Sequence, residues 1–285
     1  MNGRHDRRRD VAQAIRADEI GLEYGVYGGY KLRSACQPIY APRDGLLVPV
    51  AVEALIQPLR AGSAVPPAVL YREVLPDDRL FVESLCRALH VRNYPHIGLD
   101  GMDLFLNYDP LVNDHLGRAL AEIRLMAQRL GEYGLEASMV VCEITEQAAP
   151  DDEVLRATVR EMRRNGFRLA VDDFGAGHST EARIRMLEPD IVKIDGAWFA
   201  ELCRHAAAER LFRPLLSLLH DQGAQVLVEG IEEPAHLQIA LDAGADLLQG
   251  FLLARPALTG TLLSGEPLAI DSVARPTAKV IPLFG

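Results

Sequence analysis

Short apolar runs alternate with longer amphipathic stretches along most of this 285-residue chain, and no other feature constrains its fold as much. Runs rich in valine, isoleucine and leucine are typical of strands, whereas apolar residues three or four apart are typical of helices. The repetition predicts βα units around a parallel sheet. The expected strands are 32–39, 46–55, 104–107, 138–144, 167–171, 191–194, 225–228 and 246–248, and the expected helices are 79–91, 116–133, 151–164, 201–220 and 234–243.

This strand count predicts an α/β fold, a (β/α)8 TIM-like barrel. An open doubly wound sheet is the alternative. The first two strands are joined only by residues 41–45, a loop too short for a parallel crossover. We therefore expect the first strand to run antiparallel to its neighbour.

The ends of the chain differ in composition from its middle. Residues 1–28 are predicted to be a polar tail with one short helix at 11–20, residues 29–260 the barrel, and residues 261–285 a C-terminal extension. The basic start is followed by charged residues rather than an apolar segment, which argues against an export signal. The four cysteines form no C-x-x-C pair, which is typical of reduced thiols. We therefore expect a cytoplasmic protein without a membrane span.

Net charge excludes one class of partner. At −10, the chain has no bulk electrostatic attraction for a polynucleotide, and a two-metal nuclease is disfavoured. An anionic substrate would need a local reversal of sign, which bound metal ions supply.

Polar side chains recur where the expected strands end, and strand ends form one mouth in such a barrel. They are Glu53, Asn107, Glu143, Asp172, Asp173, Lys193, Glu229 and Gln249. Taken singly, each is more typical of a turn, a helix cap or a solvated surface. Together, their carboxylates would repel one another unless cations neutralised them. Oxygen ligands favour Mg²⁺ or Mn²⁺, and two such ions are a standard device for hydrolysing a phosphodiester.

The segments around these residues closely resemble the motifs of the EAL-domain family of cyclic-di-GMP phosphodiesterases. The matching segments are Gln37-Pro38-Ile39, Glu53-Ala54-Leu55, Leu106-Asn107, Glu143-Ile144-Thr145-Glu146, Asp172-Asp173-Phe174-Gly175 with Gly177, Lys193-Ile194-Asp195, Glu229-Gly230-Ile231-Glu232 and Gln249-Gly250-Phe251. Their order and spacing agree over roughly residues 30–258. A tripeptide of three common residues recurs by chance, so Glu53-Ala54-Leu55 is specific only together with the other matching segments.

The resemblance implies two divalent metal ions, Mg²⁺ or Mn²⁺, and hydrolysis of cyclic-di-GMP to linear pGpG by in-line attack. The implied metal ligands are Glu53, Asn107, Glu143, Asp172, Asp173 and Glu229, with Asp172 bridging both ions. Lys193 would contact the attacking water or the phosphate, Glu229 would handle protons, and Glu146 would anchor the loop after Asp173. Gln37, Gln57, Glu232 and Gln249 would lie at the substrate.

Two segments depart from the family's pattern. Gln57 stands where the family has an arginine that contacts a substrate phosphate, and its loss weakens binding by about one to two decades if nothing compensates. Arg60 either reaches the same phosphate or is a solvated loop residue. The loop after Asp173 contains His178 where an aromatic is usual, and Arg183 and Arg185 follow. That segment forms a dimer contact in many family members, so a homodimer and a solvent-exposed helix both stay open.

Three hypotheses for the function remain. The leading hypothesis is an active phosphodiesterase, because the implied metal and proton-handling residues are all present. The alternatives are a catalytically weak or inactive receptor for cyclic-di-GMP and a protein-interaction module without nucleotide. Metal-dependent turnover marks the first, nucleotide binding without turnover the second, and the absence of nucleotide binding the third.

Overall fold

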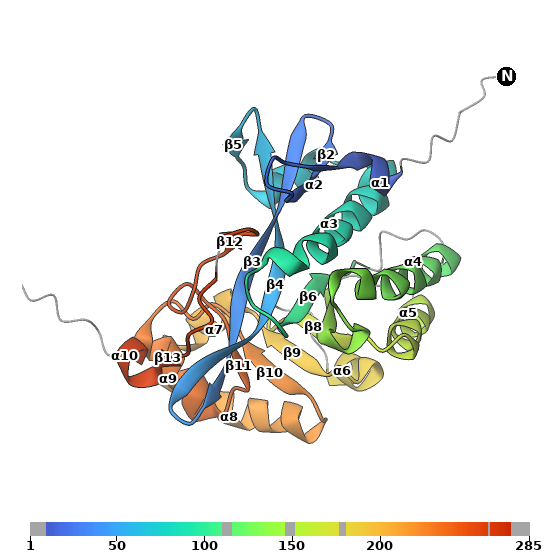
Figure 1. The fold of residues 1–285 in the computed structure, drawn as a ribbon. Helices are drawn as coiled ribbons and strands as arrows, with labels where there is room; N and C mark the ends of the chain where they lie inside the picture. Colours follow the sequence, from blue (N-terminus) through green and yellow to red (C-terminus); the bar gives the residue numbers. More distant parts are fainter. Residues whose placement is uncertain (1–9, 110–115, 146–151, 177–180, 262, 275–285) are drawn as a thin grey trace, which may run out of the picture. The chain divides into compact units, whose positions relative to one another are not determined.

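The computed structural model describes residues 10–109, 116–145, 152–176, 181–261 and 263–274 (Figure 1). Its strands are β1 (Ile15–Ala17), β2 (Glu23–Tyr27), β3 (Tyr30–Arg43), β4 (Leu46–Arg60), β5 (Ser63–Ala64), β6 (Asp103–Asn107), β7 (Val140–Thr145), β8 (Arg168–Phe174), β9 (Ile191–Ile194), β10 (Gln225–Val228), β11 (Leu247–Leu248), β12 (Ala257–Leu258) and β13 (Leu268–Ala269). The helices are α1 (Val11–Ala14), α2 (Pro67–Glu73), α3 (Arg79–Asn93), α4 (Leu116–Arg129), α5 (Asp152–Arg164), α6 (Glu181–Leu187), α7 (Gly196–Leu202), α8 (Ala206–Asp221), α9 (Pro234–Ala243) and α10 (Ile270–Ala274).

Strand pairing confirms the predicted barrel. The hydrogen-bonded order is β3-β11-β10-β9-β8-β7-β6-β4, and β3 also pairs with β4, so these strands form a closed ring. The pairs β4–β6, β6–β7, β9–β10 and β10–β11 are parallel, whereas β3 runs antiparallel to β11. The antiparallel first strand follows from the tight connection between β3 and β4, as the sequence predicts.

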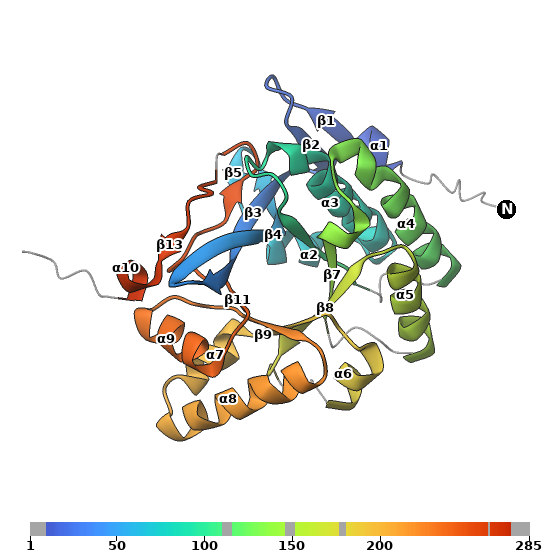
Figure 2. The same cartoon turned by 60° about the horizontal axis from the view of Figure 1, so that its bottom comes forward.

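The chain divides into two compact units. Unit 1 contains residues 1–38, 51–171 and 256–264, and unit 2 contains residues 39–50, 172–255 and 265–285. In unit 2, α8 and α9 lie beside β9 and β10 (Figure 2), and Phe212 and Leu237 pack with Val192 and Val226 in one apolar core. In unit 1, a second core joins β3 and β4 to α2 and α3 through side chains such as Leu32.

The N-terminal segment is not the polar tail that its composition predicts. Within residues 10–28, β1 pairs antiparallel with β2, and β2 pairs antiparallel with β3. Gly25 lets β2 approach α3, because a Cβ there would come within 2.9 Å of Leu89 Cδ1. Asn93 of α3 also holds β2, since it accepts from the backbone N of Glu23 and donates to its carbonyl. Only α1 remains of the expected helix.

Several element boundaries also differ from expectation. β4 continues five residues beyond Leu55 to Arg60, so Glu53 lies well inside its strand rather than near the end. β8 continues through Phe174, so Asp172 lies within its strand rather than after it. The helix expected at 201–220 is two helices, α7 and α8, and α7 begins where Asp195 accepts from Trp198 N. In the C-terminal extension, β13 pairs with the start of β4.

Candidate functional site

In unit 1, three of the predicted site residues lie on the same side of neighbouring strands. Asn107 at the end of β6 is in register with Glu143 of β7, and Glu53 of β4 is in register with Phe105. Alternate residues of a strand face the same side, so Glu53, Asn107 and Glu143 share one face. Glu143 is completely buried, whereas Asn107 is exposed and Glu53 is partly buried.

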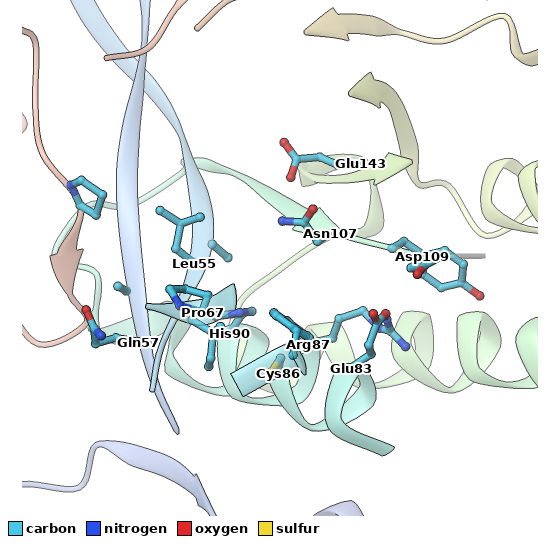
Figure 3. A pocket seen from close by; sticks show the side chains of 16 residues that line it. Leu55, Gln57, Pro67, Glu83, Cys86, Arg87, His90, Asn107, Asp109 and Glu143 are labelled. Atoms are coloured by element: carbon cyan, nitrogen blue, oxygen red, sulfur yellow. The ribbon is translucent and has the colours of Figure 1, made fainter. Parts of the chain in front are cut away.

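A pocket of about 560 Å³ opens beside these strands, and all its lining residues belong to unit 1 (Figure 3). Asn107, Glu143 and Gln57 line it. The Gln57 side-chain amide donates to the carbonyls of Pro58 and Val65, so its nitrogen is engaged by its own strand and the following segment. Gln37 is buried, 7% exposed, and is not among the residues that line this pocket.

One face of α3 adds a polar wall that the sequence motifs do not predict. Glu83, Arg87 and His90 follow one another at i, i+4 and i+7 and all line the pocket. Arg87 donates to Glu83 and Glu122, and its guanidinium lies 4.9 Å from the centre of the Tyr108 ring. Burial raises the pKa of Glu83 to about 7, while Arg87 opposes that rise. Their spacing places these three polar residues on one face of α3, and this is the sequence feature that could have indicated them.

Arg60, the last residue of β4, forms an ion pair with Glu73. Its two terminal nitrogens donate to the two carboxylate oxygens of Glu73 at 3.0 and 2.9 Å, and its guanidinium lies over the Tyr30 ring. Arg60 is not among the residues that line the pocket. The sequence leaves two roles open for Arg60, a contact to a substrate phosphate and a solvated arginine. This geometry fits the solvated arginine, whose partner is Glu73.

In unit 2, Lys193 is the centre of the predicted site residues. It lies in β9, is 1% exposed, and its Nζ is 3.2 Å from Asp172 Oδ1 and 2.7 Å from Glu229 Oε1. Asp172 belongs to β8, and Glu229 follows β10, so the lysine joins three consecutive strands of the ring. A buried ammonium between two carboxylates offsets the repulsion that the carboxylates would otherwise exert on each other.

Asp173 has an unusual backbone. Its φ of 61° places it in the left-handed region, and its backbone N donates to Asp172 Oδ1 at 3.0 Å. Burial raises the pKa of Asp173, with further increases from Asp172 and Asp195 and an opposing effect from Lys193. A left-handed aspartate at the end of a strand redirects its carboxylate relative to the regular strand alternation.

The segments after β10 and β11 are in close backbone contact. A Cβ at Gly250 would lie 2.1 Å from the Ile231 carbonyl oxygen, and one at Gly230 would lie 2.7 Å from Gly196 Cα. Gln249, which directly precedes Gly250, is 3% exposed, whereas Glu232 is exposed. These glycines fix the paths of the segments that carry Glu229 and Gln249.

Some predicted residues lie outside the described parts of the chain. These include Glu146, Gly177 and His178. The following helix, α6, is described, with Arg183 partly buried and Arg185 exposed.

The donor chemistry fits a hard divalent cation. Unit 1 places an amide oxygen and a carboxylate in register on β6 and β7, and unit 2 brings two carboxylates to Lys193. Oxygen donors of this kind suit Mg²⁺ or Mn²⁺. Among the described residues, no group of three His, Cys, Asp or Glu side chains is gathered closely enough to hold an ion by itself. The ligand assignment therefore rests on the sequence motifs. None of the described helices combines the length and apolar character that crossing a membrane requires.

Comparison with known proteins finds curated relatives that match part of this chain. The chain is similar to the probable cyclic di-GMP phosphodiesterase PdeA of Escherichia coli (strain K12), with 30% identity over 125 residues, 44% of this chain and 17% of that protein. It covers 22% of Rv1354c, an uncharacterized Mycobacterium tuberculosis protein. It therefore spans only a minor part of the curated relatives it matches.

Solved structures agree on the fold. A standalone EAL protein from Vibrio cholerae O395, in its c-di-GMP-bound form, superposes with a TM-score of 0.71 at 25% identity, over 84% of this chain and 97% of that one. Klebsiella pneumoniae BlrP1, in a manganese/cy-diGMP complex, gives 0.69 at 26% identity, over 80% and 56%. The same protein in a calcium/cy-diGMP complex gives 0.68, again at 26% identity and over 80% and 56%.

The family model that matches the sequence extends over most of the barrel. It spans residues 32–256 and therefore includes every strand of the closed ring except the first two residues of β3. This chain belongs to the EAL domain family.

Proposed function

We propose that this protein is a phosphodiesterase that hydrolyses cyclic-di-GMP to linear pGpG with the help of two divalent metal ions. The observation that carries the proposal is Lys193, a buried ammonium held between Asp172 and Glu229 at the ends of successive strands. Family membership and the phosphodiesterase named among the relatives support the same activity. Nothing in a structural barrel requires this arrangement, since replacing buried ion pairs by apolar residues is often neutral or stabilising.

The ligand roles are proposals taken from the family's motifs. By these motifs, Glu53, Asn107, Glu143 and Asp172 would be ligands of the first ion, and Asp172, Asp173 and Glu229 would be ligands of the second. When bound, the ions would supply a strong nucleophile from water and stabilise charge on the phosphoryl oxygens. We propose Mg²⁺ or Mn²⁺ because all the donors are oxygens.

The protein's own groups would position the reactants. Lys193 orients the carboxylates of Asp172 and Glu229 and presents ammonium hydrogens that can donate to a phosphate oxygen or to the attacking water. Glu229 would accept a proton in this proposal, and Lys193 Nζ lies 2.7 Å from one of its carboxylate oxygens. Gln249 would help to hold the water, and Glu146 would anchor the loop after Asp173. Gln37 and Glu232 are proposed as substrate contacts.

Gln57 is the proposed reason for weaker substrate binding than the family's arginine gives. It lines the pocket, but a neutral amide lacks the charge that strengthens hydrogen bonds to phosphate. Arg60 does not replace it in our proposal, because Glu73 holds both its terminal nitrogens. We also propose a reducing cytoplasmic setting, which the four free thiols support.

The decisive experiment incubates the purified protein with cyclic-di-GMP in Mg²⁺, in Mn²⁺ and in EDTA, with products resolved by chromatography. Metal-dependent pGpG that disappears in Asp173→Asn is the expected result. Nucleotide binding without product at any metal concentration would contradict the proposal and make the protein a receptor. Absence of both binding and product would leave only the interaction module.

A further inference from the structure

His90 is a buried residue on the pocket wall to which neither the sequence motifs nor the proposed mechanism gives a role. It projects from α3, is 7% exposed, and lines the pocket together with Asn107 and Glu143. Figure 3 shows its ring between Gln57 and Arg87, with Asn107 and Glu143 across the pocket. A histidine this buried usually has both ring nitrogens engaged, so its partners are informative.

One ring nitrogen is bonded to Ser34. The Ser34 hydroxyl lies 2.8 Å from His90 Nδ1, and Ser34 is 4% exposed. In the described part of the chain, Nδ1 is the partner found for this hydroxyl, so the buried hydroxyl hydrogen has an acceptor only if Nδ1 is unprotonated. Ser34 therefore donates, Nδ1 accepts, and the ring proton is on Nε2.

The ring is neutral as well as oriented. Burial, with a smaller contribution in the same direction from the neighbouring Arg87, lowers the pKa of His90 to about 3. A neutral imidazole with Nδ1 occupied offers one N–H donor and no charge. No hydrogen bond to Nε2 is found among the described residues, although the ring borders a pocket of about 560 Å³. That volume is within the range of sites that bind small molecules.

We propose that His90 is a substrate-contacting specificity residue, which donates from Nε2 to an acceptor on the guanine base, O6 or N7. The proposal rests on cyclic-di-GMP being the substrate. Guanine carries both acceptors on one edge, whereas adenine carries an amino donor where guanine has O6. The surrounding wall suits a flat base, because Leu55, Pro67 and Pro256 contribute apolar surface to the same pocket.

The test compares two amide substitutions that separate the two ring nitrogens. His90→Asn keeps an acceptor near Nδ1 for Ser34 but removes the donor that faces the pocket. His90→Gln places an amide N–H₂ close to the position of Nε2. Loss of one neutral hydrogen bond corresponds to a rise in Kd of about three- to tenfold, so we expect that rise in His90→Asn and about wild-type affinity in His90→Gln.

Binding is measured by isothermal titration calorimetry in Ca²⁺, with which BlrP1 forms a cyclic-di-GMP complex. His96→Gln is the matched control, because His96 is exposed and does not line the pocket. Cyclic-di-AMP serves as the second ligand. A smaller preference for cyclic-di-GMP in His90→Asn assigns the contact to O6, and equal weakening of both ligands assigns it to N7.

Wild-type affinity in His90→Asn would overturn the inference and leave the proposed function intact. If the wild-type protein bound cyclic-di-GMP without hydrolysing it, the proposed function would fail while the variants still decided the role of His90. If the wild-type protein bound no cyclic-di-GMP, both would fail. Thermal denaturation of each variant without ligand separates a lost contact from a lost fold.

Discussion

Unit 1 and unit 2 accommodate their buried carboxylates in different ways. In unit 2, Lys193 lies between Asp172 and Glu229, so the protein supplies its own counter-charge. In unit 1, the completely buried Glu143 is in register with the neutral amide of Asn107, beside an open pocket. In unit 2 a cation of the protein therefore lies beside the site carboxylates before any metal binds, whereas in unit 1 the motif residue in register with the carboxylate is a neutral amide.

The sharpest test of this difference pairs Lys193→Met with Glu143→Gln in metal-free protein. Lys193→Met leaves two carboxylates near each other without their cation, so we expect a loss of about 3–5 kcal/mol in the free energy of unfolding. Glu143→Gln removes a buried charge at nearly constant volume, so we expect no loss of stability. Urea denaturation in EDTA measures both. Equal destabilisation of the two variants would contradict the comparison, and both variants should lose phosphodiesterase activity.

Gly250→Ala tests how tightly the segments of unit 2 are fixed. The new Cβ would lie 2.1 Å from the Ile231 carbonyl oxygen, a backbone atom that cannot move alone. We expect a loss of about 2–3 kcal/mol, as is usual for overpacking. Gly29→Ala in unit 1 is the control, since a Cβ at Gly29 would meet nothing within 4 Å and no positive φ is required there. A Gly250→Ala protein as stable as the control would show that these segments yield easily.

The pH dependence of stability should report Glu83 of unit 1. Its pKa in the folded protein is about 7, above the usual 4.5, so the folded state binds the proton more tightly than the unfolded state. The contribution of Glu83 to stability is therefore fully present below about pH 4.5 and is lost as the pH rises through about 7. We expect Glu83→Gln to be about 1–2 kcal/mol more stable than wild type at about pH 8 and equal to it at about pH 4.5. Urea midpoints at the two values check this, and a constant difference would refute it.

Arg60→Met should have the smallest effect. Arg60 and Glu73 are 52% and 44% exposed, and exposed ion pairs contribute at most about 1 kcal/mol. Because Glu73 holds the guanidinium, we expect KM for cyclic-di-GMP to stay within about twofold of wild type, a change of less than about 0.5 kcal/mol. Steady-state kinetics decide. A rise in KM of about tenfold would mean that Arg60 does serve the substrate in place of the arginine missing at Gln57.

Much of the barrel could be predicted from the sequence, because its strands are short β-branched runs whose periodicity is unambiguous. β9 and β10 are predicted residue for residue. The ends of β4 and β8 could not be predicted, because Gln57, Pro58 and Asp172 are typical of loops. The strands nevertheless continue through these residues. The break between α7 and α8 was missed because the residues across Cys203–His205 have ordinary helical composition.

Only part of the candidate site could be predicted from the sequence. Lys193, Asp172 and Glu229 are indicated by their places at or next to strand ends, and the Lys193 ammonium contacts both carboxylates. Arg87 and His90 were missed because they come from a helix, where polar residues are ordinarily assigned to the solvent-facing side. Tertiary packing turns this face of α3 inward, and no local pattern specifies that choice.

The left-handed backbone at Asp173 has a consequence for how such a chain can change over generations. Holding this conformation costs a non-glycine residue about 1–2 kcal/mol, and glycine would relieve it. A lineage that no longer needed the carboxylate would gain stability from the first glycine substitution that arose there. In this chain, Asp173 therefore presents a carboxylate at the expense of backbone stability that glycine would provide.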